Sequence, residues 1–168
     1  MKTILATAGA IAVLALTSAP AQAATPTQQA TATARIYQPL SIAHVEDLDF
    51  GVIVLNNTTF GGEVVTVSQA GAVTCGGGVN MTCSGTPSAA AYELVGTPGA
   101  VVSVSSPSFS LANGGNTLAL TQLGPAGGTV TLDGDGITQF SIGGSITVAG
   151  ATVEGVYSGT FAVTADYQ

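Results

Sequence analysis

Apolar and polar residues alternate along the last part of the chain. The large apolar side chains of this segment share one face of an extended strand: Tyr157, Phe161, Val163 and Tyr167. The polar residues Thr160, Thr164 and Asp166 fall on the other face. Because successive side chains of a strand point to opposite faces, this alternation predicts a long, half-buried strand over residues 156–167. We expect its apolar face to line an assembly edge at which another chain is held.

Short runs of β-branched or alternating residues recur through the rest of the chain. Strands are expected at residues 30–37, 40–45, 50–55, 63–68, 90–95, 101–105, 117–121, 129–132, 137–142, 145–149 and 156–167. Residues that favour turns separate these runs, for example at residues 133–136 and at Gly143 and Gly144. Short strands at this spacing, without a sustained helical period, predict an all-β fold, an antiparallel β-sandwich.

The first residues of the chain have the pattern of a secretory signal peptide. Lys2 is followed by an apolar run at residues 4–16 and by Ala21-Gln22-Ala23, a small-x-small cleavage site. The apolar run is shorter than the ~20 residues that span a bilayer. We therefore expect residues 1–23 to be removed and residues 24–168 to form a single exported domain. Its expected location is the periplasm, the outer cell surface or the extracellular medium, with no membrane insertion after cleavage.

Residues 24–37 follow the predicted cleavage site and begin with a polar stretch that contains Pro26. Small or apolar residues then occupy every second position: Ala30, Ala32, Ala34 and Ile36. This segment is expected to be either the first strand of the domain's own sheet or an extension that pairs with a neighbouring subunit. Pro39 ends the run because proline cannot donate a backbone hydrogen bond to a ladder.

Composition narrows the choice of partners. Lys2 and Arg35 are the two cationic residues, against nine carboxylates, and the net charge is −7. Nucleic acids and anionic lipids bind through clusters of Lys and Arg, so neither is an expected partner. Hydrophobic residues make up 46% of the chain and charged residues 7%, a balance that favours a folded domain over disorder. A surface so poor in charge is tolerable in a subunit of an assembly.

The two cysteines, Cys75 and Cys83, are close in sequence. An even pair in an oxidising compartment predicts a disulfide, a local staple across a hairpin or loop. A metal site would need further Cys or His ligands, and His44 is the chain's single histidine. We expect neither a metal, a cofactor nor a redox role.

The densest polar cluster contains His44, Glu46, Asp47 and Asp49. A hydrolase would use His44 as a base for a serine nucleophile, but the chain has no Gly-x-Ser-x-Gly motif. A solvated loop between two strands is the expected structure of this cluster. No spacing offers a recognisable nucleophile together with a base, so enzymatic activity and catalytic residues are not expected.

Residues 133–136, Asp-Gly-Asp-Gly, resemble the start of a calcium-binding loop. The twelfth position of that loop, where the EF-hand pattern needs Glu, is Gly144. Asp-Gly between two expected strands favours a tight hairpin turn instead.

Four segments of the chain together resemble the bacterial family called domain of unknown function 4402: Pro39-Leu40-Ser41-Ile42, Leu48-Asp49-Phe50-Gly51, residues 94–99 and residues 155–164. The resemblance covers nearly all of residues 24–168 and implies an exported β-protein with no established reaction. The Leu-Asp-Phe-Gly segment and the terminal strand are also similar to spore-coat-U-type and chaperone–usher pilin subunits. That similarity implies an incomplete immunoglobulin-like sandwich, which the N-terminal strand of a neighbour completes.

We therefore expect a structural subunit of a bacterial surface filament or coat, assembled by β-strand addition. The expected donor residues are Ala30, Ala32, Ala34 and Ile36, and the expected receiving edge carries Tyr157, Phe161, Val163 and Tyr167. The expected partners are further copies or related surface subunits, and a periplasmic chaperone is a candidate. The alternative is a self-contained sandwich that acts as an adhesin or binds carbohydrate. The absence of Trp speaks against that alternative, because sugar sites use flat aromatic faces.

Overall fold

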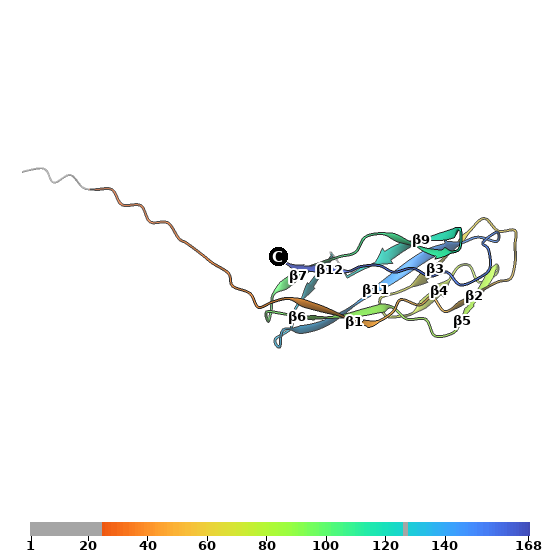
Figure 1. Cartoon of the computed structure of the whole chain (residues 1–168), viewed down its shortest axis with the longest axis horizontal. Coiled ribbons are helices and arrows are strands. Elements are labelled where there is room, and N and C mark those ends of the chain that lie inside the picture. Colours follow the sequence, from red (N-terminus) through yellow and green to blue (C-terminus); the bar gives the residue numbers. More distant parts are fainter. Residues whose placement is uncertain (1–24, 126–127) are drawn as a thin grey trace, which may run out of the picture. The chain divides into compact units, whose positions relative to one another are not determined.

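The computed structural model describes residues 25–125 and 128–168 (Figure 1). The predicted signal peptide, residues 1–23, lies outside the described residues. The chain divides into two units, Met1–Arg35 and Ile36–Gln168. Residues 25–35 of the first unit form no helix or strand. The second unit, called the β-domain below, contains the strands. Among the described residues, none belongs to a helix with the length and hydrophobicity that a membrane span requires.

The β-domain is built from antiparallel strands. They are β1 (Ser41–Glu46), β2 (Val52–Leu55), β3 (Glu63–Val67), β4 (Val73–Cys75), β5 (Met81–Ser84), β6 (Ala90–Val95), β7 (Val101–Ser105), β8 (Phe109–Asn113), β9 (Asn116–Leu123), β10 (Thr129–Thr131), β11 (Ile137–Val148) and β12 (Thr164–Tyr167). The largest sheet has the order β1-β6-β11-β3-β4, and the hairpin β8–β9 joins it through β9 and β11. A second sheet has the order β10-β7-β12, and β2 and β5 form a two-stranded ribbon. The predicted all-β, antiparallel fold is confirmed.

Strand β11 organises the domain because its two halves have different neighbours. Residues 137–142 pair with β6, whereas residues from Gly143 onward pair with β9 and β3. The even-numbered side chains of β11 point into the core, as the period of a strand requires. Phe140 and Ile142 belong to one buried cluster, and Ile146 and Val148 belong to another.

The two clusters together form the core. The first contains Ala90, Tyr92, Leu94, Ala100, Val102, Val104, Val130, Leu132, Phe140 and Ile142. The second contains Phe50, Val65, Val67, Met81, Leu120, Ile146 and Val148. Leu48 packs against both clusters. Each cluster draws on strands that are distant in sequence, so the pairing of β11 with its neighbours is what brings the core together.

The prediction of a turn at Gly143 and Gly144 was wrong, since both residues lie inside β11. The absence of a side chain here serves close packing. A Cβ atom on Gly143 would lie 2.3 Å from the carbonyl oxygen of Val67, and one on Gly144 would lie 3.0 Å from Leu48. The two glycines therefore let β3 and the residues before β2 approach β11.

The predicted disulfide between Cys75 and Cys83 is confirmed. Cys75 lies in β4, at the edge of the largest sheet, and Cys83 lies in β5 of the two-stranded ribbon. The bond thus links two sheets covalently, a larger role than the local staple that its spacing had indicated.

Replacing both Cys75 and Cys83 with Ser is expected to lower the free energy of unfolding by about 2 to 3 kcal/mol, because the unfolded chain gains the entropy of an open loop. Urea unfolding followed by circular dichroism measures this change. Wild-type protein in reducing buffer is the control and should lose a similar amount. An unchanged urea midpoint in the double variant would show that the bond adds nothing to stability.

Candidate functional site

A cavity of about 1170 Å³ opens in the β-domain between two segments of the chain. One wall is formed by residues 47–55, which include β2, and the other by residues between 150 and 161. The floor is almost entirely apolar and is made of Ala90, Tyr92, Phe109, Leu111, Leu118, Leu120, Ile146 and Val148. We call this feature the groove. Its floor belongs to or packs against the core, so core side chains line the cavity.

The first wall has an open strand edge. Among the strands described, β2 pairs with β5 alone, which leaves its second edge without a strand partner. Such an edge presents backbone N–H and C=O groups in a row. Val52 and Val54, 56% and 50% exposed, also line the groove. This wall therefore combines unused hydrogen-bonding groups with exposed apolar surface.

The second wall is fixed to β8 on one side only. Ser158 and Ala112 exchange two backbone hydrogen bonds of 3.0 and 2.8 Å, and the side-chain amide of Asn113 donates to the carbonyl oxygen of Glu154. The ring of Phe161 stacks on Phe109 with 4.8 Å between ring centroids. Along the described residues, the edge facing away from β8 has no strand partner. The groove thus lies between two open edges.

The terminal strand is shorter than expected. Only Thr164–Tyr167 forms a strand, β12, and residues 156–163 are irregular except for the bridge at Ser158. Glycine explains the break: Gly155 has φ of +137°, and Gly159 passes close to the ring of Phe109. The four residues expected on the assembly edge are divided. Tyr157 and Phe161 line the groove, whereas Val163 and Tyr167 pack against the first core cluster, which Phe161 also contacts.

Tyr167 instead connects the last residues of the β-domain to its first residues. Its hydroxyl accepts a hydrogen bond from the backbone N–H of Thr97 at 2.8 Å and donates one to the carbonyl oxygen of Gln38 at 2.9 Å. Its ring stacks on Tyr37 with centroids 4.6 Å apart. The backbone N–H of Gln38 also donates to the Thr97 hydroxyl. Sequence reasoning missed Tyr37 and Gln38, because nothing in the local pattern indicates a contact with residue 167.

The expected donor residues lie before the first strand. No strand is found between residue 25 and β1, so the interpretation of residues 30–37 as a strand of the domain's own sheet was wrong. Ala30, Ala32 and Ala34 belong to the first unit. Ile36 is the first residue of the β-domain and is 91% exposed. We call residues 25–36 the extension.

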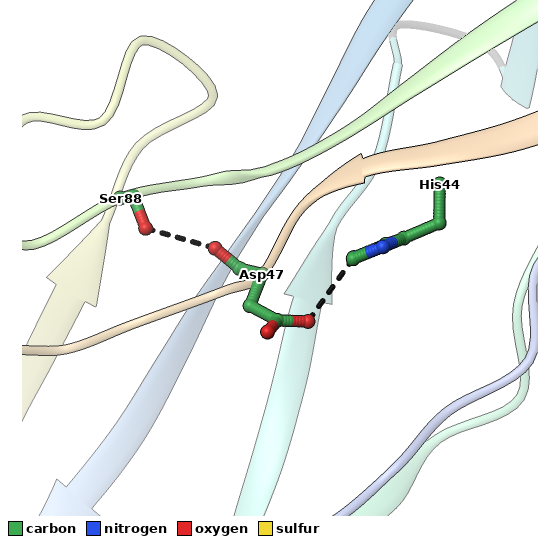
Figure 2. Close-up of polar contacts among 3 residues, drawn as sticks. All are labelled: His44, Asp47 and Ser88. Atoms are coloured by element: carbon green, nitrogen blue, oxygen red, sulfur yellow. Dashed lines mark hydrogen bonds and ion pairs between the residues drawn. The ribbon is translucent and has the colours of Figure 1, made fainter.

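His44, Asp47 and Asp49 line the groove, and Figure 2 shows the contacts of His44 and Asp47. His44 is in β1 and not in a loop, because β1 pairs it with Tyr92, whose ring lies 5.6 Å away. Its Nε2 atom is 3.0 Å from the carboxylate of Asp47. Burial and the charge of Asp47 raise the pKa of Tyr92 above its ordinary value. These groups add polar side chains to the lining of the groove.

The arrangement in Figure 2 does not form a catalytic triad. The hydroxyl of Ser88 donates to the backbone carbonyl oxygen of Asp47 at 2.8 Å, and not to the imidazole of His44. A serine nucleophile needs the imidazole as its hydrogen-bond partner. Ser88, which precedes β6, therefore binds the residue after β1. His44 and Asp47 can supply hydrogen bonds and charge to whatever lies in the groove.

Residues 133–136 form the predicted turn, but the turn does not close a hairpin. The carboxylate of Asp133 accepts hydrogen bonds from the backbone N–H groups of Asp135 and Ile137, at 3.0 and 2.9 Å. Strand β10 before the turn pairs with β7, and β11 after it pairs with β6, so the chain passes between two sheets. Within residues 25–125 and 128–168, no three His, Cys, Asp or Glu side chains are grouped to hold a metal ion.

Comparison with known proteins gives one match. A family model with the description "Domain of unknown function (DUF4402)" matches residues 40–167. The match includes both walls of the groove and leaves the extension outside. No curated protein and no solved structure matches the chain.

Proposed function

The chain belongs to the DUF4402 family, and we propose that it is a structural subunit of a bacterial surface filament or coat that assembles by β-strand addition. The groove is the observation that carries this proposal. It has two open backbone edges, that of β2 and that of residues 153–161, facing a common space, and a floor of core side chains. An immunoglobulin-like sandwich with one strand missing would have this arrangement.

A strand placed in the groove would serve both walls. Its backbone groups would pair with the free edges of β2 and of residues 153–161, and its inward side chains would cover the apolar floor. Covering this floor removes apolar surface from water, which is the main favourable term in association. An exposed edge beside apolar side chains also promotes unwanted aggregation, so a lone subunit needs the groove covered. A periplasmic chaperone is the proposed cover before assembly.

The extension of a neighbouring copy is the proposed donor. Its residues alternate between small or apolar side chains and polar ones, the pattern that a strand needs when one face is buried. Fully extended, residues 25–36 would span about 40 Å. They equal in number the residues from 150 to 161, which form the second wall. The extension therefore has the length and the pattern to fill the groove.

A second candidate function is the binding of carbohydrate or another small ligand by a self-contained domain. The observation in its favour is that five Phe or Tyr residues line the groove: Phe50, Tyr92, Phe109, Tyr157 and Phe161. Ligand sites are commonly apolar cavities with a few polar groups. The two open backbone edges have no role in such a site, which is why we place it second.

Removing residues 24–36 is expected to abolish polymer formation while leaving the subunit able to fold with its chaperone. The truncated chain keeps an empty groove, and it has no donor to offer to the next copy. The measurement is size-exclusion chromatography of full-length and truncated protein, each expressed with and without the candidate periplasmic chaperone. The full-length protein, expected to form high-mass species, is the control.

Two results would contradict the proposal. One is a truncated chain that polymerises as well as the full-length chain. The other is a truncated chain that folds as a stable monomer without any chaperone, which would favour the self-contained domain.

A further inference from the structure

The extension does not define its own register through its apolar pattern. Residues 30–34 read Ala-Thr-Ala-Thr-Ala, so a shift by two residues places the same side chains on the same face. Register is weakly specified wherever such a slip leaves the buried face unchanged. Directly after this repeat, Arg35 and Ile36 have no equivalent within it. If the extension binds in a single register, these two residues are the ones that can select it.

The direction of the added strand follows from where the extension leaves the β-domain. Ile36 precedes Tyr37, which stacks on Tyr167 at the C-terminal end of β12. The second wall begins at the opposite end, where the backbone N–H of Gly150 donates to the carbonyl oxygen of Phe60. Figure 1 shows β2 and β5 at one end of the β-domain and the C-terminus at the other. When copies are stacked end to end, Ile36 of one copy therefore lies near the start of the second wall of its neighbour. The extension then runs antiparallel to that wall.

Charge then distinguishes one register from its neighbours. Arg35 lies on the face opposite to Ile36, so it points out of the groove when Ile36 points in. A slip by two residues keeps Arg35 opposite an even-numbered position of the second wall. These positions are Gly150, Thr152, Glu154, Val156, Ser158 and Thr160, and Glu154 and Val156 are exposed. Glu154 is the one charged residue in this series. A slip by two residues in either direction moves Arg35 from Glu154 to Thr152 or Val156.

Three carboxylates line the groove, those of Asp47, Asp49 and Glu154, and that of Glu154 is free to pair with Arg35. Asp47 is paired with His44, and the carboxylate of Asp49 accepts the backbone N–H of Gly51. Within the described residues, the carboxylate of Glu154 has no hydrogen-bond or ion-pair partner. Arg35 in turn is the one cation in the chain after residue 2. Opposite charges across an interface set register and orientation.

We propose that the groove takes residues 28–36 of a second copy in one antiparallel register, with Arg35 opposite Glu154. This inference rests on the proposed function and adds the identity and alignment of the donor. The same alignment places Ile36 opposite Val153 and Ala32 opposite Tyr157, both of which line the groove. It also places Gln28 opposite Phe161, which lines the groove as well. Because different surfaces meet at each contact, copies add head to tail, and they form an open filament when the rotation between copies does not close a ring.

The test uses the full mature chain with the conservative change Arg35→Lys, which keeps the charge and provides the one lysine of that chain. A zero-length carbodiimide joins a lysine amine to a carboxylate that it touches. Polymers grown from a mixture of unlabelled and nitrogen-15 chains are cross-linked, and the joined peptides are identified by mass spectrometry. The expected product joins the introduced lysine to Glu154, with peptides of mixed isotopic origin.

A charge exchange provides the second measurement. Arg35→Glu and Glu154→Arg are each expected to slow polymer growth roughly tenfold, since each change opposes like charges across the interface. The double variant should recover growth because the opposite charges are restored in exchanged positions. Asp47→Arg is the matched control on the other wall, and it should leave Arg35→Glu unrescued.

The outcomes separate the register from the proposed function. Polymers whose cross-link joins the lysine to another carboxylate, or a double variant without recovery, would overturn the register and leave strand addition standing. Cross-links formed within single copies would show that the extension fills its own groove, which overturns the inference. A full-length chain that forms no polymer would overturn both proposals.

Discussion

Ala32→Asp is expected to abolish polymer formation, whereas Thr33→Asp is expected to leave it nearly unchanged. The two positions are neighbours, but in an added strand they face opposite sides. An aspartate at position 32 would enter the apolar groove beside Tyr157, where burying an unpaired charge costs several kcal/mol. An aspartate at position 33 would stay in water. Electron microscopy and sedimentation of purified, full-length variants measure the effect.

The subunit itself should be unaffected by either change. Residues 25–35 form no strand, so neither side chain belongs to the folded core of the β-domain. Both variants are therefore expected to melt at the temperature of the wild-type subunit, which serves as the control for folding. Equal loss of polymer in the two variants would contradict a donor strand with one buried face.

Gly143→Ala is expected to lower the free energy of unfolding by about 3 kcal/mol, the upper part of the range for overpacked cores. The added methyl group would lie 2.3 Å from the carbonyl oxygen of Val67 and 2.8 Å from the carbonyl carbon of Ser68. These are backbone atoms of the neighbouring strand and the turn after it, so β3 and β11 would have to separate. Urea unfolding of the purified variant provides the measurement.

Gly134→Ala is the matched control for this prediction. Nothing lies within 4 Å of the position that its Cβ would occupy, and the residue is in an exposed turn. Its stability should stay within about 0.5 kcal/mol of wild type, as for most surface substitutions. If Gly143→Ala were as mild as Gly134→Ala, the close approach of β3 to β11 would not be required for folding.

The all-β class, most strands and the disulfide could be predicted from the sequence because they depend on local signals. Alternation and β-branched runs mark strands, and a pair of cysteines with no other partner leaves one pairing. The turn predicted at Gly143 and Gly144 was wrong because glycine occurs both in turns and where two backbones approach closely. Choosing between them requires knowing that β3 lies against β11, a contact between segments some 75 residues apart in the chain.

The groove could not be predicted from sequence patterns for a similar reason. Residues 47–55 and 150–161 are distant in the chain, and what matters is that none of the strands described in the β-domain lies between them. Alternation correctly marked Tyr157 and Phe161 as inward-facing residues of this region. It could not separate them from Val163 and Tyr167, because the alternation is the same along the whole segment, whereas only residues 164–167 pair with a neighbouring strand, β7.

The contacts of Tyr167 bear on how a filament of such subunits would respond to tension. A pull on residue 36 reaches the β-domain first at Tyr37 and Gln38, which the side chain of Tyr167 and the hydroxyl of Thr97 hold. Beyond them the load passes to β1, whose antiparallel pairing with β6 lies along the direction of the chain. Sliding β1 along β6 requires several of its hydrogen bonds to break together, whereas peeling would break them one at a time. The mechanical strength of the filament would thus depend on the junction of β1, β6 and Tyr167 as well as on the strand in the groove.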